Sequence, residues 1–130
     1  MSKCRIIIAG GRDFTDYEKL KTAATGVIND LTRWYDNIQI EIVSGGASGA
    51  DKLGERFAEE FGYSLAKFPA DWDKYGKGAG IIRNKQMAKY AVSDKCIGML
   101  IAFWDGKSRG TKNMIEIAIN LDIGYYVINY

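Results

Sequence analysis

Histidine is absent from this chain of 130 residues, and cysteine is scarce, with only two residues. Without histidine the chain supplies neither a Ser-His or Cys-His catalytic pair nor the commonest zinc ligand of proteins. Cys4 and Cys96 each stand at the start of an apolar run, where a small buried hydrophobe is the usual role. We therefore expect no metal site and no disulfide framework, and any catalysis would fall to carboxylates, Lys, Arg or Tyr.

Long apolar segments and an excess of charge are also missing. No run of about 18 apolar residues occurs, and the opening Met-Ser-Lys-Cys does not have the pattern of a signal peptide. We expect a cytoplasmic protein that does not contact membranes. Lys and Arg total 18 against 16 Asp and Glu, with the two signs interspersed, so nucleic acid is not an expected partner.

The composition that remains suits one folded unit. Hydrophobic residues make up 47% of the chain, there is a single proline, and no linker or low-complexity segment divides the sequence. We therefore expect one domain over residues 1–130.

Five apolar segments with the pattern of strands alternate with four segments of helical periodicity. The strands are expected at 4–9, 38–43, 63–68, 96–103 and 125–130, and the helices at 17–31, 50–61, 80–92 and 111–122. Such alternation requires right-handed crossovers and a parallel sheet, which defines an α/β fold of three layers. Because segments 4–9 and 96–103 are uniformly apolar, we place them adjacent at the centre and predict the strand order 3-2-1-4-5.

Several helix details follow from residue spacing. Thr15 and Glu18 have the spacing of a capping box, and Gly62 is suited to end the second helix. In the third helix Ile81, Ala88 and Ala91 fall on one face. The buried stripe of the first helix is expected to comprise Tyr17, Leu20, Ala24, Val27, Ile28 and Leu31.

The predicted strand order opens a crevice at the carboxyl ends of the first and fourth strands, where open α/β sheets bind ligands. Three polar turns should meet there, at 10–13, 44–51 and 104–111. Their glycines let a ligand approach the backbone, and the helices that follow offer free N–H groups to an anion such as phosphate. For the second turn the alternative is a tight connection in which Gly45 and Gly46 only bend the chain and Ser44 or Ser48 only caps the helix.

The stretch 69–80 is the longest irregular segment, and its length and aromatic content favour a binding loop. Trp72 within it either stacks on a base or anchors the loop to the core. Arg83 and Asn84 follow in the first turn of the next helix, where a guanidinium and a helix N-terminus can share an anion. The alternative for Arg83 is an exposed, solvated side chain.

Five short motifs together resemble the YspA-like, cpYpsA-related branch of the SLOG superfamily. They are Gly-Gly-Arg-Asp-Phe at 10–14, Ser-Gly-Gly-Ala-Ser-Gly-Ala-Asp at 44–51, Pro-Ala-Asp-Trp at 69–72, Ala-Gly-Ile-Ile-Arg-Asn at 79–84 and Ser-Arg-Gly-Thr at 108–111. The resemblance covers nearly the whole chain. It implies a Rossmann-like domain that binds nucleotides or nucleotide-derived ligands, often as a dimer or higher oligomer, but it implies no known reaction.

The chain is also similar to the Lonely Guy phosphoribohydrolases of the same superfamily, which cleave the N-glycosidic bond of nucleoside monophosphates. Their motif is Pro-Gly-Gly-x-Gly-Thr-x-x-Glu, with an arginine in the preceding helix. Arg83 looks like that arginine and Gly110-Thr111 like the phosphate-holding pair, but Met114 stands where the glutamate is expected. The carboxylate stabilises an oxocarbenium-like transition state, and a methionine cannot replace it in that role.

The sequence therefore predicts a module that binds a nucleotide or an ADP-ribose-like molecule, as a sensor, carrier or sponge, without a cofactor. The competing hypothesis is a hydrolase of nucleotide N-glycosidic bonds, with Arg83 in the site and Asp13, Asp51 or Asp105 in place of the missing glutamate. Residue patterns identify neither the ligand nor its fate. The residues expected to contact the ligand are Gly10, Gly11, Arg12, Asp13, Ser44, Gly45, Gly46, Ala47, Asp51, Trp72, Arg83, Asn84, Trp104, Ser108, Gly110 and Thr111.

Within that set the roles differ by chemistry. Phosphate would lie on backbone amides, arginines would neutralise its charge, and acidic and amide side chains would contact sugar or base. The expected amides are those of Gly45, Gly46, Ala47, Gly110 and Thr111, the arginines are Arg12 and Arg83, and the side chains are Asp13, Asp51 and Asn84.

The last helix, between Thr111 and Asp122, is apolar around most of its circumference. A helix beside a sheet needs only one apolar stripe, so its opposite side should be polar. Here the polar strip consists only of Asn113, Glu116 and Asn120. We expect a second subunit to cover the remaining apolar face, which makes the protein a homodimer or higher homo-oligomer. The alternative is a neighbouring helix of the same chain.

Overall fold

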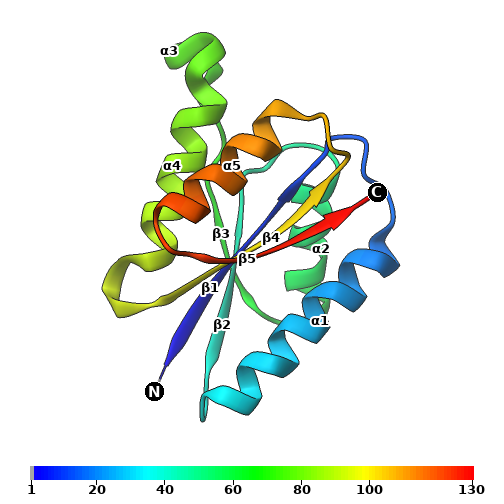
Figure 1. Cartoon of the computed structure of the whole chain (residues 1–130), viewed down its shortest axis with the longest axis vertical. Coiled ribbons are helices and arrows are strands. Elements are labelled where there is room, and N and C mark those ends of the chain that lie inside the picture. The colour runs from blue at the N-terminus through cyan, green and yellow to red at the C-terminus, as the bar shows by residue number, and fades with distance from the viewer. Residues whose placement is uncertain (1) are drawn as a thin grey trace.

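The computed structural model, which describes residues 2–130, contains one sheet of five parallel strands in the order β3-β2-β1-β4-β5. The predicted α/β fold and strand order are therefore confirmed. The strands are β1 Lys3–Gly10, β2 Gln39–Ser44, β3 Ser64–Lys67, β4 Ile97–Trp104 and β5 Gly124–Asn129. Figure 1 views the sheet from the β5 side, with the other strands behind it.

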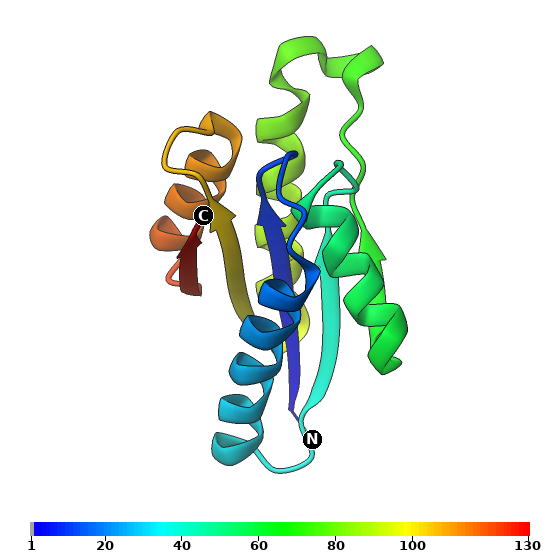
Figure 2. The same ribbon diagram turned by 90° about the vertical axis from the view of Figure 1, so that its right-hand side faces the viewer.

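Helices cover both faces of the sheet and complete a fold of three layers (Figures 1 and 2). One face is covered by α1 and α2, and the other by α4 and α5. The helices are α1 Tyr17–Trp34, α2 Ala50–Phe61, the single-turn α3 Trp72–Tyr75, α4 Ala79–Val92 and α5 Arg109–Asn120. Among the described residues, no helix has the length and apolarity needed to cross a membrane.

The central strands β1 and β4 are buried on both faces, which explains their uninterrupted apolar sequences. Ile6 and Ile101 point into the cluster beneath α1 and α2. Their neighbours Ile7 and Leu100 point into the cluster beneath α4 and α5. Strand alternation thus builds two cores from one sheet, and it fixes the carboxyl ends of β1 and β4 side by side.

Most helix details agree with the sequence, and a few do not. The stripe predicted for α1 is buried, and Gly62 ends α2 in the left-handed conformation with φ 71°. Asp16, not Thr15, caps α1, because its side chain accepts the Lys19 amide. Neither Ser44 nor Ser48 caps α2, whose N-cap is Gly49, without a side-chain hydrogen bond.

The prediction for α4 was wrong at Ile81, which is 47% exposed, whereas Met87 is buried with Ala88 and Ala91. The first turns of α4 extend past the ends of the strands in Figure 2, so this part of the helix has no sheet to cover. Spacing alone does not reveal how far a helix overhangs its sheet. Ile81 instead lines the cavity described below.

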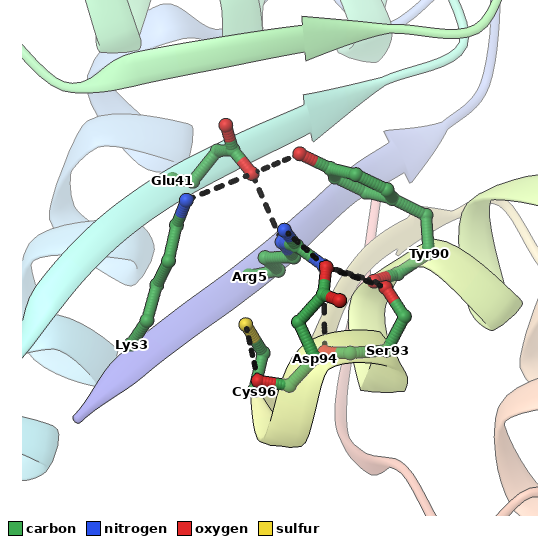
Figure 3. Close-up of polar contacts among 7 residues, drawn as sticks. All are labelled: Lys3, Arg5, Glu41, Tyr90, Ser93, Asp94 and Cys96. Carbon is green, nitrogen blue, oxygen red and sulfur yellow. Dashed lines mark hydrogen bonds and ion pairs between the residues drawn. The ribbon is translucent and has the colours of Figure 1, made fainter.

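A buried polar network joins β1, β2 and the end of α4 at the opposite pole from the carboxyl ends of the strands (Figure 3). Arg5 is 6% exposed and donates to Glu41 at 3.1 Å, to the Tyr90 carbonyl at 2.7 Å and to the Ser93 hydroxyl at 2.7 Å. The Tyr90 hydroxyl also donates to Glu41, and its ring lies 3.8 Å from the Arg5 guanidinium. This network therefore lies at the end of the sheet opposite the predicted ligand crevice.

Candidate functional site

The three predicted turns and the 69–80 stretch surround a cavity of about 590 Å³ at the carboxyl ends of β1 and β4. A recess of about 280 Å³ adjoins it and shares Arg12, Ala47, Trp72 and Arg83. The predicted residues that line the cavity are Gly10, Gly11, Arg12, Asp13, Ala47, Asp51, Trp72, Arg83, Asn84, Asp105, Ser108, Gly110 and Thr111. Gly45 and Gly46 line the recess.

Two predicted residues lie outside both hollows. Ser44 is fully buried beneath its turn, and Trp104 packs against the core on the α4 and α5 side. The Trp104 indole donates to the Ser108 carbonyl at 3.0 Å, so it positions the turn before α5. Both residues pack behind the turns and line neither hollow.

The glycines of the first turn are required by contacts within the protein. A Cβ on Gly10 would meet the Phe103 carbonyl, and one on Gly11 would meet the Tyr130 hydroxyl. The Ala50 amide donates to the Gly11 carbonyl at 3.1 Å, which packs the second turn directly on the first. The absence of side chains at Gly10 and Gly11 therefore allows the turns to pack against each other.

Asp13 faces the cavity from the same turn and is tied to the end of the chain. It accepts the Tyr130 hydroxyl at 2.5 Å. Burial and this hydrogen bond raise the pKa of Tyr130 to about 12. The phenol therefore stays protonated at neutral pH and holds one oxygen of Asp13 in place.

Two backbone amides of the second turn already donate hydrogen bonds within the protein. The Gly46 amide donates to the Ser44 hydroxyl at 3.0 Å, and the Ala47 amide donates to Asp51 at 3.2 Å. Both amides were expected to hold phosphate, and the structure gives them internal acceptors instead. By accepting hydrogen bonds from these two amides, the side chains of Ser44 and Asp51 hold the loop in its shape.

Asp51 is the buried carboxyl of the site, with 4% of its surface exposed. Burial is the main cause that raises its pKa to about 6, while the Ala47 amide and the charge of Arg83 act in the opposite direction. Loss of water around a carboxylate favours its neutral form. Asp51 therefore titrates close to neutral pH on the floor of the cavity.

This titration gives a first prediction. The pKa of Asp51 is about 6 in the folded chain, above its ordinary value of 3.8. Protonation of Asp51 therefore stabilises the folded state. This contribution to the unfolding free energy is complete below pH 3.8 and is lost as the pH rises through about 6. Asp51→Asn does not titrate. Its unfolding free energy relative to wild type should rise by roughly 2 to 3 kcal/mol between about pH 4 and pH 7.

Urea unfolding at both pH values measures the effect. The matched control is Gln86→Ala, a change at an exposed residue without an ionisable group, whose difference from wild type should stay nearly constant with pH. A pH-independent difference for Asp51→Asn as well would show that Asp51 does not titrate in this range.

Arg83 leans from α4 over the second turn. Its Nη1 donates to the Gly45 carbonyl at 2.6 Å, and its Nε donates to the Asn84 side chain at 3.0 Å. The guanidinium is thus held in place between two hollows, and the alternative of a freely solvated side chain is wrong. Burial lowers the pKa of Arg83, the charge of Asp51 acts in the opposite direction, and the charge of Arg12 lowers it further.

Asn84 links α4 to the start of α5. Its side-chain amide donates to the Gly110 carbonyl at 3.2 Å and to Asn113 at 3.0 Å. The side chain is 5% exposed. Because its donors are engaged in this way, Asn84 positions the first turn of α5 beside Arg83.

The first turn of α5 forms part of the cavity wall. Ser108 caps the helix by accepting the Thr111 amide, and Asp105 accepts the Lys107 and Ser108 amides at 2.8 Å each. Those hydrogen bonds lower the pKa of Asp105 and favour the carboxylate. Within residues 2–130 the amides of Arg109 and Gly110 have no hydrogen-bond acceptor, and both residues line the cavity.

Sequence reasoning missed several lining residues. Two are cations, Lys77 and Arg109, and the others are Ala9, Gly80, Ile81, Met87, Asn113 and Met114. The position of Arg109 between Ser108 and Gly110 is a signal that was available, because a side chain in the first turn of a helix lies beside any anion there. Lys77 carries no such signal, since its position depends on the path of the 69–80 stretch.

The long loop is partly helical and does not anchor to the core. Trp72 begins the single-turn α3 and is 49% exposed, with one side toward both hollows. The Arg12 guanidinium lies 5.9 Å from its ring centroid. Among the described residues no group of three or more His, Cys, Asp or Glu side chains has an arrangement that could hold a metal ion.

A family model described as the YspA, cpYpsA-related SLOG family matches residues 4–75. The chain belongs to this family. The matched residues carry the first two turns and Trp72 of this SLOG protein, whereas Arg83 and the start of α5 lie beyond the match and line the same cavity. The resemblance inferred from the motifs is therefore confirmed.

Two further comparisons place this SLOG protein among known chains. It is 33% identical over 131 residues to the Gene 61 protein of Mycobacterium phage D29, covering 97% of this chain and 95% of the relative. It also resembles the crystal structure of a predicted subunit of tRNA methyltransferase from Methanocaldococcus jannaschii DSM. That likeness has a TM-score of 0.39 and 16% identity over 98% of this chain and 67% of the other.

Proposed function

We propose that this protein binds a nucleotide or a nucleotide-derived molecule in the cavity at the carboxyl ends of its strands. One observation carries the proposal: four cationic side chains and the first-turn amides of α5 line a hollow that also contains an indole. The cations are Arg12, Lys77, Arg83 and Arg109. Anions bind at helix N-termini beside guanidinium groups, and aromatic rings stack on bases.

The phosphate is assigned to the start of α5. The amides of Arg109 and Gly110 would donate to it, and Arg83 would approach from α4. This places the phosphate on the third turn, since the amides of Gly46 and Ala47 are engaged within the second. Trp72 stands across the cavity with half of its surface exposed, where a base can stack on it.

As a biological role we propose a sensor, carrier or sponge for such a molecule, acting as one domain and without a resident cofactor. Met114 supports binding over cleavage. It lines the cavity at the position where the related hydrolases are expected to carry their glutamate, and only 1% of its surface is exposed. Asp105 is poorly placed to replace that carboxylate, because the Lys107 and Ser108 amides both donate to one of its oxygens and hold it within the turn before α5.

Asp51 keeps hydrolysis of the N-glycosidic bond as a second candidate function. It lines the cavity, and a carboxyl with a pKa of about 6 is suited to proton transfer near neutral pH. Its contact with the Ala47 amide, however, uses one of its oxygens for the loop. Asp51 is therefore assigned a structural role in the site unless base release is observed.

One experiment separates these functions. Titration calorimetry with AMP, ADP, ADP-ribose, ribose 5-phosphate and adenosine should detect binding of the phosphorylated nucleotides and much weaker binding of adenosine. Chromatography of the same mixtures should show no released base. Released base would establish the hydrolase, and the absence of binding by every phosphorylated compound would contradict the proposed function. Native mass spectrometry of the purified protein identifies any copurifying ligand.

A second prediction concerns Arg83. A charge-assisted hydrogen bond contributes roughly 1.5 to 3 kcal/mol, so Arg83→Ala should weaken nucleotide binding by about tenfold or more. Arg83→Lys keeps the charge but not the planar fork, and its affinity should lie between those of Arg83→Ala and wild type. Calorimetry with the tightest-binding nucleotide measures the three affinities.

The matched control is Arg33→Ala, which removes an exposed arginine near the far end of α1. Its affinity should equal that of wild type. Equal affinities for Arg83→Ala and wild type would remove Arg83 from the ligand site and leave it only the role of holding the Gly45 carbonyl.

A further inference from the structure

The outer edge of β5 is the most unusual surface of the molecule outside the cavity. It ends the sheet, and no strand among residues 2–130 pairs with that edge. In Figure 1 β5 lies in front of the other strands, and no helix crosses it. Unpaired strand edges offer a row of backbone donors and acceptors to another strand, so natural proteins usually protect them.

The two edge strands of this sheet differ in length and in sequence. The β3 edge is short, at four residues, ends in Lys67 and is followed by Pro69. Short length, lysine and proline are the common means of blocking edge pairing. The β5 edge is six residues long, and residues 123–130 contain neither a charged side chain nor a proline. The β3 edge is thus protected by its own sequence, whereas β5 has no such protection in its own residues.

Apolar side chains surround the open edge. Tyr125 is 48% exposed, Tyr126 41% and Val127 36%, and Ile119 and Leu121 at the end of α5 are 48% and 44% exposed. Only part of the predicted apolar surface of α5 is therefore exposed. Helix α4 packs on α5, and the buried part of α5 faces it and the sheet. What remains exposed is continuous in sequence with β5.

The backbone of β5 shows which groups face outward. The Tyr130 amide donates to the Trp104 carbonyl, so Tyr130 and the residues two and four before it pair with β4. Tyr125 and Val127 therefore turn their N–H and C=O groups to the open edge. The next residue in that series, Asn129, already has its carbonyl hydrogen-bonded to the Lys19 ammonium at 3.0 Å.

We propose that this edge pairs with β5 of a second copy of the chain, antiparallel and related by a twofold axis, to form a continuous sheet of both subunits. A twofold contact places each residue near its own counterpart, and a strand without charge meets no like-charge repulsion there. The antiparallel direction also brings Asp122, just before β5, toward the far end of the partner strand. There the partner's Lys19, on α1, donates to the Asn129 carbonyl. A parallel arrangement would oppose like charges.

The proposed arrangement also determines where the two cavities lie relative to each other. Antiparallel pairing of β5 directs the carboxyl ends of the two sheets away from each other. The cavities then lie at opposite ends of the dimer and stay open. The inference does not depend on the identity of the ligand or on the proposed function.

Light scattering tests the pairing, with Val127→Lys as the disrupting change and Trp34→Lys as its control. Wild type at submillimolar concentration should have twice the chain mass of 14.5 kDa. Val127→Lys places a charge next to its own counterpart and should return the mass to that of one chain. Trp34, 80% exposed at the end of α1, is remote from the edge, so Trp34→Lys should remain a dimer.

A monomeric wild type, or a Val127→Lys variant that remains a dimer, would overturn the proposal. If Val127→Lys fails to fold, amide hydrogen exchange of wild type decides. The Tyr125 and Val127 amides should exchange more slowly at submillimolar than at low micromolar concentration. Equal exchange at both concentrations would equally overturn it.

Discussion

Gly110→Leu should abolish nucleotide binding while leaving the fold intact. A Cβ added at this position would meet no protein atom within 4 Å beyond its own helical turn, and Gly110 lines the cavity, so a larger side chain has room to extend there. It would occupy the place assigned to the phosphate and cover the first-turn amides of α5. We expect the affinity to fall by at least about a hundredfold, or about 2.8 kcal/mol.

The matched control for this change is Gly26→Leu. Gly26 also lies on a helix, α1, is exposed, and has no protein atom within 4 Å of an added Cβ. Both variants should gain helix propensity of up to about 1 kcal/mol. Calorimetry should therefore find wild-type affinity for Gly26→Leu and no measurable binding for Gly110→Leu. Undiminished binding by Gly110→Leu would exclude the start of α5 as the phosphate position.

Arg5→Met should cause the largest loss of stability. It removes the cation that contacts Glu41 at 3.1 Å and leaves that buried carboxylate with the Tyr90 hydroxyl and the more distant Lys3 (Figure 3). Removing one partner of a buried ion pair costs about 3 to 5 kcal/mol, because the other charge stays buried without compensation. Urea unfolding at neutral pH measures the loss.

Two further variants distinguish a buried charge from lost packing. Replacing both partners, as Arg5→Met with Glu41→Leu, should restore most of the stability, since no unpaired charge then remains. Arg33→Met breaks an exposed pair with Asp30 at 3.6 Å and should cost at most about 0.5 kcal/mol. A cost below about 1 kcal/mol for Arg5→Met would mean that the network contributes little to folding.

The cavity and the Arg5 network lie at opposite ends of the same strands. Arg5 lies near the amino end of β1, and Gly10 ends the strand at the cavity. Binding should therefore be insensitive to the Arg5 change at temperatures where the variant is folded. This separation allows the effects on stability and on affinity to be measured independently.

The convergence of the three turns was predictable because it depends only on strand order. Uniform apolarity placed β1 and β4 together, and in a parallel sheet adjacent carboxyl ends lie at one edge. The same local pattern located the start of α5 and the motifs that resemble the SLOG family. Such features need only residue type and spacing.

The internal hydrogen bonds of the turns were not predictable in this way. Whether the Gly46 and Ala47 amides face a ligand or the protein depends on the side-chain directions of Ser44 and Asp51. Likewise, Asp16 displaced Thr15 as the cap of α1 because its oxygen reaches the Lys19 amide. Both outcomes rest on differences of a few ångströms, to which residue spacing is insensitive.

Periodicity and turn chemistry are local properties, and they were sufficient for the fold class, the strand order and the place of the crevice. Contacts between residues distant in the chain were decided only by the folded structure. Arg5 meets Tyr90, Arg83 meets Gly45, and Tyr130 meets Asp13. Each pair joins segments whose relative position is set by the packing of helices on the sheet, and no window of sequence contains both partners.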